Sequence, residues 1–367
     1  MRIAQVAPLY ESVPPKLYGG TERIVSFLTE KLVELGHNVT LFASGDSITS
    51  AKLRPVVPEA LRLSGRCEDP LAPHLLQVQE VVDRHQEFDI IHFHTDYLNF
   101  PFTQHLETPH VTTLHGKLTL PELVQVYRRF SRQPVVSISD SQRTPLPFAN
   151  WAGTVLHGLP ADLYSKGPGG EYLAFLGRIS PEKGIEAAIA IAKKSGIQLK
   201  IAAKIDRVDE DYFSHTVAPL LDHPLVDFIG EITDEQKNEF LGNALALLFP
   251  IAWPEPFGLV MIESIACGTP VIAFRRGSVP EIISHGKSGY VVDSVEQAVQ
   301  AVHWTQRLDR DGVRRCFNER FTSDRMARQY IQVYEELRQD AADRRETKLL
   351  TLKSMYASPN TVTAARG

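Results

Sequence analysis

Two glutamates eight positions apart are the residues whose spacing most directly suggests chemistry. Glu255 lies between two prolines that hold the backbone extended, and Gly258 then lets the chain turn into a helix. The free backbone N–H groups of Phe257, Gly258 and Leu259 would face a ligand there. Glu263 lies about 7.5 Å further along, at about 1.5 Å per residue. Because a hexose hydroxyl and a nucleotide ribose are about that far apart, the segment predicts a sugar-nucleotide site; the alternative is an ordinary helix with an acidic first turn.

Three further loops carry residues suited to a phosphate or a sugar. Gly19 and Gly20, ahead of the first expected helix, would let backbone N–H groups approach an anion. Arg178 and Lys183 suit a diphosphate, the first as a fork of donors and the second as a point charge. His115 follows an expected strand and has a glycine behind it. The plainer alternatives are a flexible loop, a solvated basic turn and a structural histidine, one of 13 in the chain.

The elements that must position these loops follow the pattern of doubly wound parallel sheets, in which short apolar runs alternate with amphipathic helices. Strands are expected at residues 2–7, 38–43, 89–94, 110–114, 134–139 and 154–156, and, after the turn-rich residues 167–170, at 172–176, 198–203, 227–229, 245–249, 270–274 and 289–292. Ligands bind beyond the carboxyl ends of such strands, where the four loops lie.

The length of 367 residues indicates two α/β domains, since one core rarely grows so large. We expect the two domains at residues 1–165 and 166–322, with the glycine-rich residues 167–170 as the linker; the family resemblance described below implies that the first is the acceptor-binding domain and the second the nucleotide-sugar-binding domain. A helix at 323–340 is expected to cross back onto the first domain. Residues 341–367 lose the apolar periodicity, which predicts a loosely ordered tail.

Composition narrows the class of protein. A net charge of −5 gives no sequence-wide basic field, so nucleic acid is not an expected partner. Cys67, Cys267 and Cys316 are odd in number and far apart, which argues against disulfides and a Cys-x-x-Cys metal site and favours a cytoplasmic protein. No signal peptide is expected, and the most apolar run, residues 244–253, is broken by Pro250. A transmembrane segment is therefore not expected, while peripheral membrane contact stays open.

Together the four loops resemble the retaining glycosyltransferases of family 4, which have the GT-B fold: two facing Rossmann-like domains with a cleft between them. The resemblance extends to about residue 338. Its most specific element is the family's Glu-x7-Glu signature, present here as Glu255 and Glu263. One departure is His157-Gly158 after the last strand of the first domain, where the family often has Asn-Gly.

The resemblance implies a role for each candidate residue. The donor-binding residues would be Gly19, Gly20, Arg178, Lys183, Glu255, Phe257, Gly258, Leu259 and Glu263. The residues implied in catalysis are His115, Arg178, Lys183 and Glu255. In these roles the two cations neutralise the leaving diphosphate, Glu255 and the backbone after it hold the transferred sugar, and Glu263 holds the ribose. His115 would form a hydrogen bond to the sugar near the reacting carbon.

The expected reaction needs neither a metal nor an organic cofactor. Breaking a glycosyl phosphate bond builds negative charge on the diphosphate, and fixed cations can stabilise it. Residues 209–211 match the Asp-x-Asp pattern of metal-using transferases, but they precede a helical run where acidic residues are favoured, so a structural role is preferred. The acceptor hydroxyl is expected to attack on the face from which the diphosphate leaves, which retains the anomeric configuration.

Substrate identity is only partly indicated. UDP-glucose is the first choice of donor and GDP-mannose the second. The acceptor is unspecified: the first domain's loops are aromatic and mixed in charge, Tyr18 and Asp96 are candidate contacts, and the first 160 residues weakly resemble a branch that includes pterin glucosyltransferases. The alternatives are an epimerase of the same fold, a glycogen-type phosphorylase and a non-catalytic nucleotide-sugar-binding protein. The first would need its own acid and base carboxylates and the second a lysine bound to pyridoxal phosphate.

Overall fold

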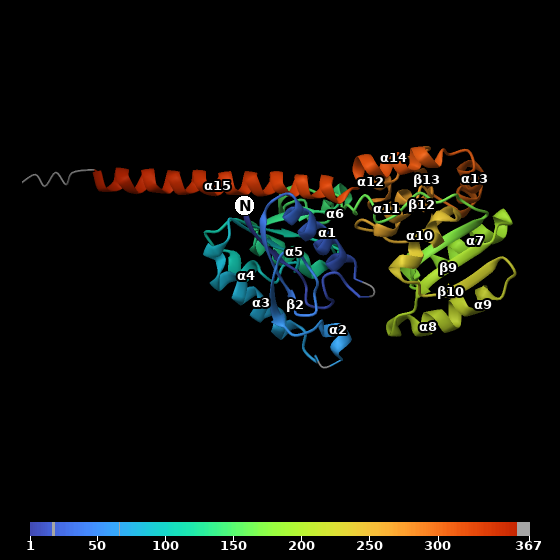
Figure 1. The fold of residues 1–367 in the computed structure, drawn as a ribbon, viewed down its shortest axis with the longest axis horizontal. Helices are drawn as coiled ribbons and strands as arrows, with labels where there is room; N and C mark the ends of the chain where they lie inside the picture. Colours follow the sequence, from blue (N-terminus) through green and yellow to red (C-terminus); the bar gives the residue numbers. More distant parts are fainter. Residues whose placement is uncertain (17–18, 66, 358–367) are drawn as a thin grey trace, which may run out of the picture.

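Two parallel sheets form the two lobes of the protein in a computed structural model that describes residues 1–16, 19–65 and 67–357 (Figure 1). The first sheet has the order β3-β2-β1-β4-β5-β6-β7. Its strands are β1 (Arg2–Val6), β2 (Asn38–Ser44), β3 (Lys52–Val57), β4 (Ile90–Phe93), β5 (His110–Thr113), β6 (Pro134–Ser137) and β7 (Asn150–Thr154). The helices between them are α1 (Gly20–Glu34), α2 (Leu61–Ser64), α3 (Leu71–Asp83), α4 (Phe100–Thr103), α5 (Pro121–Arg129) and α6 (Asp140–Arg143), with a short 3₁₀ helix at His85–Glu87.

The second sheet has the order β10-β9-β8-β11-β12-β13. Its strands are β8 (Tyr172–Arg178), β9 (Leu199–Lys204), β10 (Val226–Gly230), β11 (Ala244–Phe249), β12 (Val271–Phe274) and β13 (Gly289–Val292). The helices are α7 (Ile185–Ser195), α8 (Glu210–Tyr212), α9 (Ala218–Leu221), α10 (Asp234–Gly242), α11 (Leu259–Ala266), α12 (Val279–Ile282), α13 (Val295–Thr305), α14 (Arg310–Arg320) and α15 (Ser323–Ala357), with 3₁₀ helices at Pro181–Lys183 and Arg207–Asp209 and a π-helical turn at Phe213–Val217.

The predicted fold class, two Rossmann-like parallel-sheet domains of the GT-B type, is confirmed. In each sheet the strand order reverses beside the first strand, at β1/β4 and at β8/β11. Loops diverge there and leave a crevice at the carboxyl ends, which is where open sheets of this type bind ligands. The fold therefore brings two such crevices face to face.

Two details of the first sheet differ from the sequence-based expectation. Strand β3 was not predicted, because it is a half-buried edge strand that contains Pro55, and edge strands lack the continuous apolar run of a central strand. Strand β7 covers Asn150–Thr154 rather than residues 154–156. Both lie at the edges of the sheet, where one face is less buried and the pattern is weaker.

The last helix crosses between the lobes. It begins in the second lobe and packs against α1 of the first. Met326, Tyr330 and Tyr334 recur every four residues and are fully buried, so one face of the helix enters the core of the first lobe. Burying each such side chain is worth about 1.5–3 kcal/mol, which holds the crossing helix in place.

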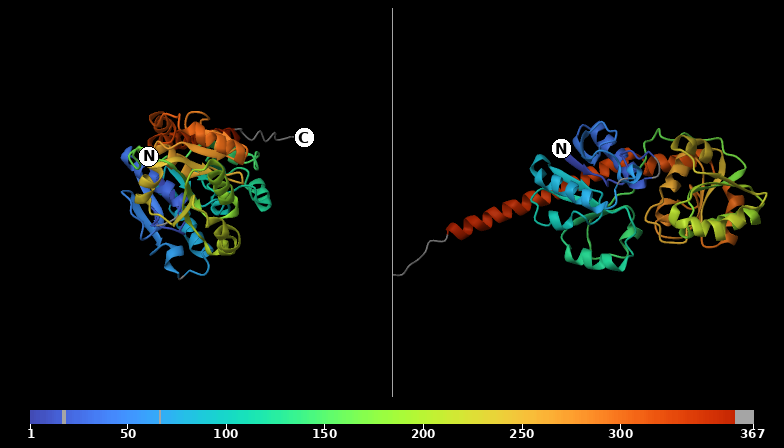
Figure 2. Two further views of the ribbon diagram at one scale, coloured as in Figure 1. Left: turned by 90° about the vertical axis from the view of Figure 1, so that its right-hand side faces the viewer. Right: turned by 90° about the horizontal axis from the view of Figure 1, so that it is seen from below.

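Helix α15 continues to Ala357, so residues 341–357 are helical rather than the loosely ordered tail that was expected. Figures 1 and 2 show this part projecting beyond the first lobe. Its apolar periodicity is lost because nearly all of its described side chains are exposed, while its composition of Ala, Leu, Arg, Lys and Glu still favours a helix. Among the described residues, no helix is both long enough and apolar enough to cross a bilayer.

The two chain crossings between the lobes pair with each other. Leu159 N–H donates to the Phe321 carbonyl at 2.8 Å, and Ser323 N–H donates to the Leu159 carbonyl at 2.8 Å. The glycine-rich segment, expected as the linker, is instead fixed to the second lobe: Gly167 N–H donates to Cys267 at 3.0 Å and Gly169 N–H to Gly242 at 2.9 Å. A hinge motion would therefore act at the paired crossings near Leu159 and Phe321 rather than at residues 167–170.

Candidate active site

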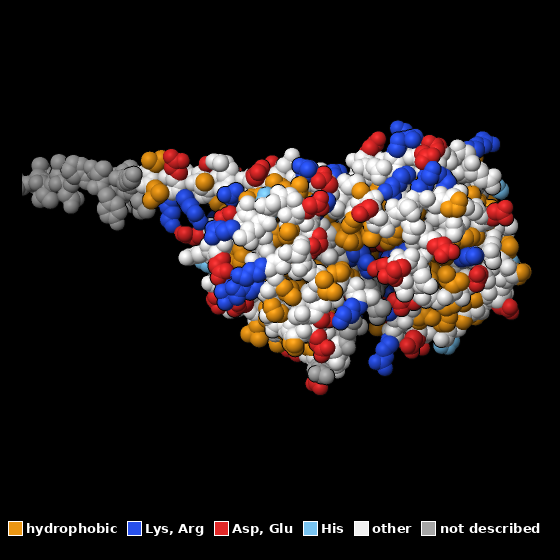
Figure 3. All heavy atoms as spheres, in the orientation of Figure 1, with side chains coloured by type: hydrophobic (Ala, Val, Ile, Leu, Met, Phe, Trp, Pro, Cys, Tyr) orange, Lys and Arg blue, Asp and Glu red, His pale blue; other side chains and the backbone are white. Residues whose placement is uncertain are grey.

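A cleft of about 1320 Å³ lies between the lobes at the carboxyl ends of both sheets. Figure 3 shows the surface hollowed there, with basic and acidic side chains at its rim. The predicted site residues that line this cleft are Gly19, Gly20, Asp96, His115, Arg178, Lys183, Glu255, Phe257, Gly258, Leu259 and Glu263. Tyr18 lies outside the described residues. The fold thus gathers the described candidates from both halves of the chain into one cavity.

Two helix N-termini face each other across the cleft. Helix α11 starts after Gly258, whose φ of +80° suits glycine, and α1 starts at Gly20. A side chain at Gly20 would lie 3.6 Å from Leu259, so the two helix starts approach closely. Each N-terminus presents unpaired N–H groups and the positive end of a helix dipole. Together they form a site suited to an anionic group such as a diphosphate.

Glu255 is paired with the lysine of the neighbouring turn. Lys183 Nζ lies 2.7 Å from Glu255 Oε2, and Trp253 Nε1 donates to the same oxygen at 3.1 Å. The lysine follows β8 on a 3₁₀ turn, while the glutamate lies in the loop after β11, so neighbouring strands bring them together. Glu255, predicted to bind the sugar of the donor, and Lys183, predicted to bind its diphosphate, are therefore in direct contact.

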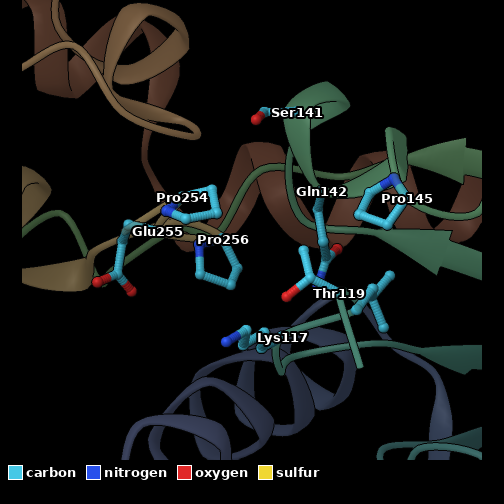
Figure 4. Close-up of a pocket in the computed structure, with 9 residues that line it drawn as sticks. Lys117, Thr119, Ser141, Gln142, Pro145, Pro254, Glu255 and Pro256 are labelled. Carbon is cyan, nitrogen blue, oxygen red and sulfur yellow. The ribbon is translucent and has the colours of Figure 1, made fainter. Parts of the chain in front are cut away.

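The loop that carries Glu255 is held from both sides. Figure 4 shows the Glu255 carboxylate directed away from Gln142 and Pro145 of the first lobe, with Pro256 toward them. Ser139 Oγ donates to the Pro256 carbonyl at 2.6 Å across the lobe boundary. On the other side, Gly277 has φ +53° and packs so closely on the Glu255 backbone that a Cβ would overlap it. The direction of the Glu255 side chain is thus fixed by backbone packing.

Glu263 is buried and contacts two groups that the sequence did not indicate. Tyr164 Oη donates to Glu263 Oε1 at 3.3 Å, and Lys237 Nζ lies 3.3 Å from the same atom. Lys237 also lies 2.9 Å from Asp234 Oδ1, and Asp234 is paired with Arg23 of α1 in the first lobe. The second glutamate of the signature is therefore part of an ionic cluster that bridges the lobes.

Arg178 is surrounded by carboxylates. It lies 2.7 Å from Glu182, 3.4 Å from Asp206 and 3.7 Å from Asp209. Asp209 begins the Asp-x-Asp match, and Asp211, its last member, is exposed. Within the described ranges, no group of three or more His, Cys, Asp or Glu side chains is arranged to hold a metal ion. Asp209 thus contacts the cation of the neighbouring turn.

The first-lobe wall of the cleft is rich in neutral histidines. His115 follows β5, and burial lowers its pKa to about 3. His115 stacks on His157 with ring centroids 5.3 Å apart, and His157 contacts Phe257 of the second lobe at 4.7 Å. His157 is the residue at which the chain departs from the family pattern, and it fills the space between the histidine of one lobe and the signature loop of the other.

Asp96 lies on the same wall with a left-handed backbone, φ +51°. Its side chain is exposed to the cleft, and the loss of solvent between the cleft walls raises its pKa to about 6. The aromatic side chains Tyr10 and Tyr97 also line this part of the cavity and are exposed. This wall thus combines aromatic surfaces with one carboxylic acid.

Sequence reasoning missed several residues of this site: Arg23, His94, Trp253, Tyr164, Lys237 and Gly277. Trp253 lies two residues before Glu255, and Arg23 lies three residues after Gly20, so these two are near recognised motifs. The others come from elements that meet the motifs only in the folded chain, so no local pattern could have found them.

Comparisons with known proteins agree with this architecture. Residues 164–319 match the family model described as glycosyl transferases group 1, and residues 18–143 match the model described as Glycosyltransferase Family 4. A phosphatidyl-myo-inositol mannosyltransferase of Mycolicibacterium smegmatis is 25% identical over 323 residues, which cover 80% of this chain and 81% of that protein.

Two solved structures have the same fold. AviGT4, a glycosyltransferase involved in avilamycin A biosynthesis, has a TM-score of 0.72 and 23% identity, covering 92% of this chain and 98% of that one. HepE of Anabaena in complex with UDP-glucose has a TM-score of 0.64 and 18% identity, covering 92% of this chain and 99% of that one.

Proposed function

Because the chain belongs to the family 4 glycosyltransferases, we propose that it transfers glucose from UDP-glucose to an acceptor hydroxyl, with retention and without a metal ion. The observation that carries the proposal is the convergence of two helix N-termini, Lys183 and the two signature glutamates on one cleft. HepE, which has the same fold, binds UDP-glucose, and this supports a uridine nucleotide sugar as donor. GDP-mannose is the alternative.

The Lys183–Glu255 pair gives a physical account of the transfer step. With donor bound, the ammonium group would lie between the carboxylate and the diphosphate. As the glycosyl bond breaks, charge grows on the diphosphate, so the attraction to Lys183 grows while the attraction to Glu255 does not. Glu255, held by the backbone around it, would meanwhile bind the sugar hydroxyls. Such an interaction stabilises the transition state more than the bound substrate.

Arg178 would have a smaller part in this step than Lys183. Three carboxylates already surround its guanidinium, and their charge offsets its own. The N-terminal dipoles of α1 and α11 supply further positive potential toward the diphosphate. We therefore assign most of the leaving-group stabilisation to Lys183 and the helix N-termini, and a supporting role to Arg178.

The acceptor site belongs on the first-lobe wall. Tyr10 and Tyr97 offer flat aromatic faces, and Asp96 offers a hydrogen-bonding carboxyl group. These suit a cyclic acceptor with hydroxyl groups, either a sugar or a flat heterocycle such as a pterin. Membership of the pterin branch stays a prediction.

The experiment that tests the proposal is a thermal-shift screen of nucleotide sugars, followed by product analysis. A bound donor stabilises the fold by mass action, so UDP-glucose should raise the melting temperature more than GDP-mannose. Proton NMR of the first product should then show an α-glucoside, with turnover unchanged by EDTA. A β-linked product would contradict retention, and loss of activity in EDTA restored by magnesium would contradict metal independence.

A further inference from the structure

A chain of buried hydrogen bonds starts at His115 and ends on the crossing helix. His115 Nε2 lies 2.9 Å from His94 Nδ1, and His94 Nε2 lies 2.8 Å from Gln5 Oε1. Gln5 Nε2 donates to Tyr334 Oη at 3.0 Å, and that hydroxyl lies 2.7 Å from His92 Nδ1. Apart from the ring of His115, which is partly open to the cleft, these side chains are fully or almost fully buried. This series of hydrogen bonds links the cleft to α15, and its side chains come from four different parts of the fold.

The directions of these bonds follow from the chemistry of the groups. An amide oxygen can only accept, so His94 must donate to Gln5 from Nε2–H. A neutral imidazole carries one hydrogen, and burial keeps the pKa of His94 well below its usual value, so Nδ1 of His94 is an acceptor. His115 must therefore donate to it from Nε2–H. The other nitrogen of His115, Nδ1, is left without a hydrogen.

We propose that His94 is a positioning residue for glycosyl transfer, which holds His115 in the tautomer with hydrogen on Nε2 and leaves Nδ1 to accept a hydrogen bond from a substrate hydroxyl. The inference rests on the proposed function in that His115 is taken to contact the substrate. His115 Nδ1 is buried and has no hydrogen-bond partner in the described part of the chain. A buried polar atom without a partner costs about 1–3 kcal/mol, and a bound hydroxyl would remove that cost.

The far end of the chain ties this tautomer to the crossing helix. Tyr334 Oη accepts from Gln5, which holds the amide with its oxygen toward His94. From Tyr334 the bonds continue through His92 to Thr113 at 2.7 Å, and from Thr113 to Tyr330 Oη at 2.9 Å. If the Gln5 amide turned over, it would donate to His94 and the hydrogen of His115 would move to Nδ1. Tyr334 therefore acts on His115 through two other side chains, Gln5 and His94.

The first test is ¹⁵N NMR of the full-length protein with labelled histidine, which reads the tautomer without any substrate. The His115 signals are assigned by their loss in His115→Gln. The wild type should show hydrogen on Nε2 of His115, and a wild-type signal with hydrogen on Nδ1 would overturn the proposal. His94→Phe should convert His115 to a mixture or to the Nδ1–H tautomer, whereas His94→Asn, whose amide oxygen can still accept, should keep the original tautomer.

Turnover is measured on the same variants with UDP-glucose. His94→Phe should lower kcat by about 10- to 100-fold, the scale of removing the outer partner of a functional histidine, with KM for the donor little changed. His94→Asn should recover most of the loss. His110 lies on β5, as Thr113 does, but its ring contacts Thr108 and Gln133 instead of the linked side chains. His110→Asn is therefore the matched control. It should change neither the tautomer nor kcat.

Tyr334→Phe guards against a variant that fails to fold, since it removes one oxygen at the remote end. It should shift the His115 tautomer in part and lower kcat several-fold. An unchanged tautomer and unchanged kcat in both Tyr334→Phe and His94→Phe would overturn the proposal. Full activity in His115→Gln would instead overturn the assigned contact between His115 and the substrate, and would do so whatever tautomer the NMR shows.

Discussion

The two walls of the cleft differ in whether their polar side chains are charged. The second-lobe wall is ionic: Lys183 pairs with Glu255, and Lys237 with Glu263. On the first-lobe side the histidine cluster, called the neutral wall below, is uncharged because burial keeps His94, His115 and His157 neutral; a hydrogen bond joins the first two. Charges suit a diphosphate whose charge grows during the reaction, while neutral donors and acceptors suit hydroxyl groups. Under the proposed function, the second lobe would therefore stabilise the growing charge and the first lobe would recognise hydroxyl groups.

The largest expected effect comes from removing the central cation of the ionic wall. Lys183→Ala should lower kcat by at least about 100-fold, the scale of losing one preorganised contact to a developing charge. It also leaves Glu255 without its ion pair. Steady-state kinetics with UDP-glucose, with and without EDTA, measures this.

Lys194→Ala is the matched control for that variant, because Lys194 forms an exposed pair with Glu296 on the outside of the second lobe. It should leave kcat within about twofold of the wild type, since exposed ion pairs contribute only about 0–1 kcal/mol. A loss in Lys183→Ala no larger than that of Lys194→Ala would mean that the ionic wall does not carry the leaving-group charge.

The next effect divides the two glutamates of the ionic wall. Glu255→Gln should lower kcat by about 10- to 100-fold while free UDP still binds, because Glu255 is assigned to the sugar and UDP has none. Glu263→Gln should weaken UDP binding by about 10-fold, since a hydrogen bond to a charged group is worth about 1.5–3 kcal/mol. Calorimetric titration with UDP separates the two. Equal losses of UDP affinity in both variants would contradict this division of roles.

The neutral wall should make the protein less stable in mild acid. His115, with a folded pKa of about 3, and His92, His94 and His157, with pKa values well below the usual value, stay uncharged in the fold, while in the unfolded chain they bind protons below about pH 6.5. Above about pH 6.5 these histidines do not lower the free energy of unfolding. Below that pH the free energy of unfolding decreases as the pH drops toward 3, by up to about 1.4 kcal/mol per pH unit for each histidine.

Glu22 and Asp96 change the free energy of unfolding in the opposite sense, because burial raises their pKa values to about 7 and about 6. Burial also raises the pKa of Glu11, but the four histidines outnumber these acids, so the free energy of unfolding is expected to fall in mild acid.

Urea unfolding at pH 7.5 and pH 5.5 measures this difference. The wild type should be less stable at pH 5.5, and His157→Asn should reduce the dependence on pH because one buried histidine is gone. His303→Asn, on the exposed face of α13, is the control and should leave the dependence unchanged. Equal stability of the wild type at both pH values would show that the histidine wall is not held neutral by the fold.

The ionic wall was largely predictable from sequence and the neutral wall largely was not, for a physical reason. Glu255 and Glu263 lie on one loop and one helix, so their spacing carries their geometry. His94 and His115 meet because β4 and β5 are neighbours, and Tyr334 arrives from a helix more than 200 residues away. The sequence predicted that His115 would follow the strand at residues 110–114, but it did not predict that His94, the last residue of the strand expected at 89–94, would meet it. Pairing across sheets is set by tertiary packing, which a single sequence does not display.

The smallest expected effect concerns the ion pair that joins the two walls. Arg23 of α1 contacts Asp234 of α10, and through Lys237 this pair reaches Glu263. Arg23→Gln should raise the dissociation constant for UDP-glucose by less than about fivefold, since partly exposed pairs are worth about 0.2–1 kcal/mol and are screened by salt. The difference from wild type should shrink further in 1 M salt. Solution scattering should show compaction with UDP-glucose in the wild type and less in Arg23→Gln, because the pair joins the two lobes. Equal compaction in both would mean that the two walls close on the donor without this link, and that the hinge alone sets their distance.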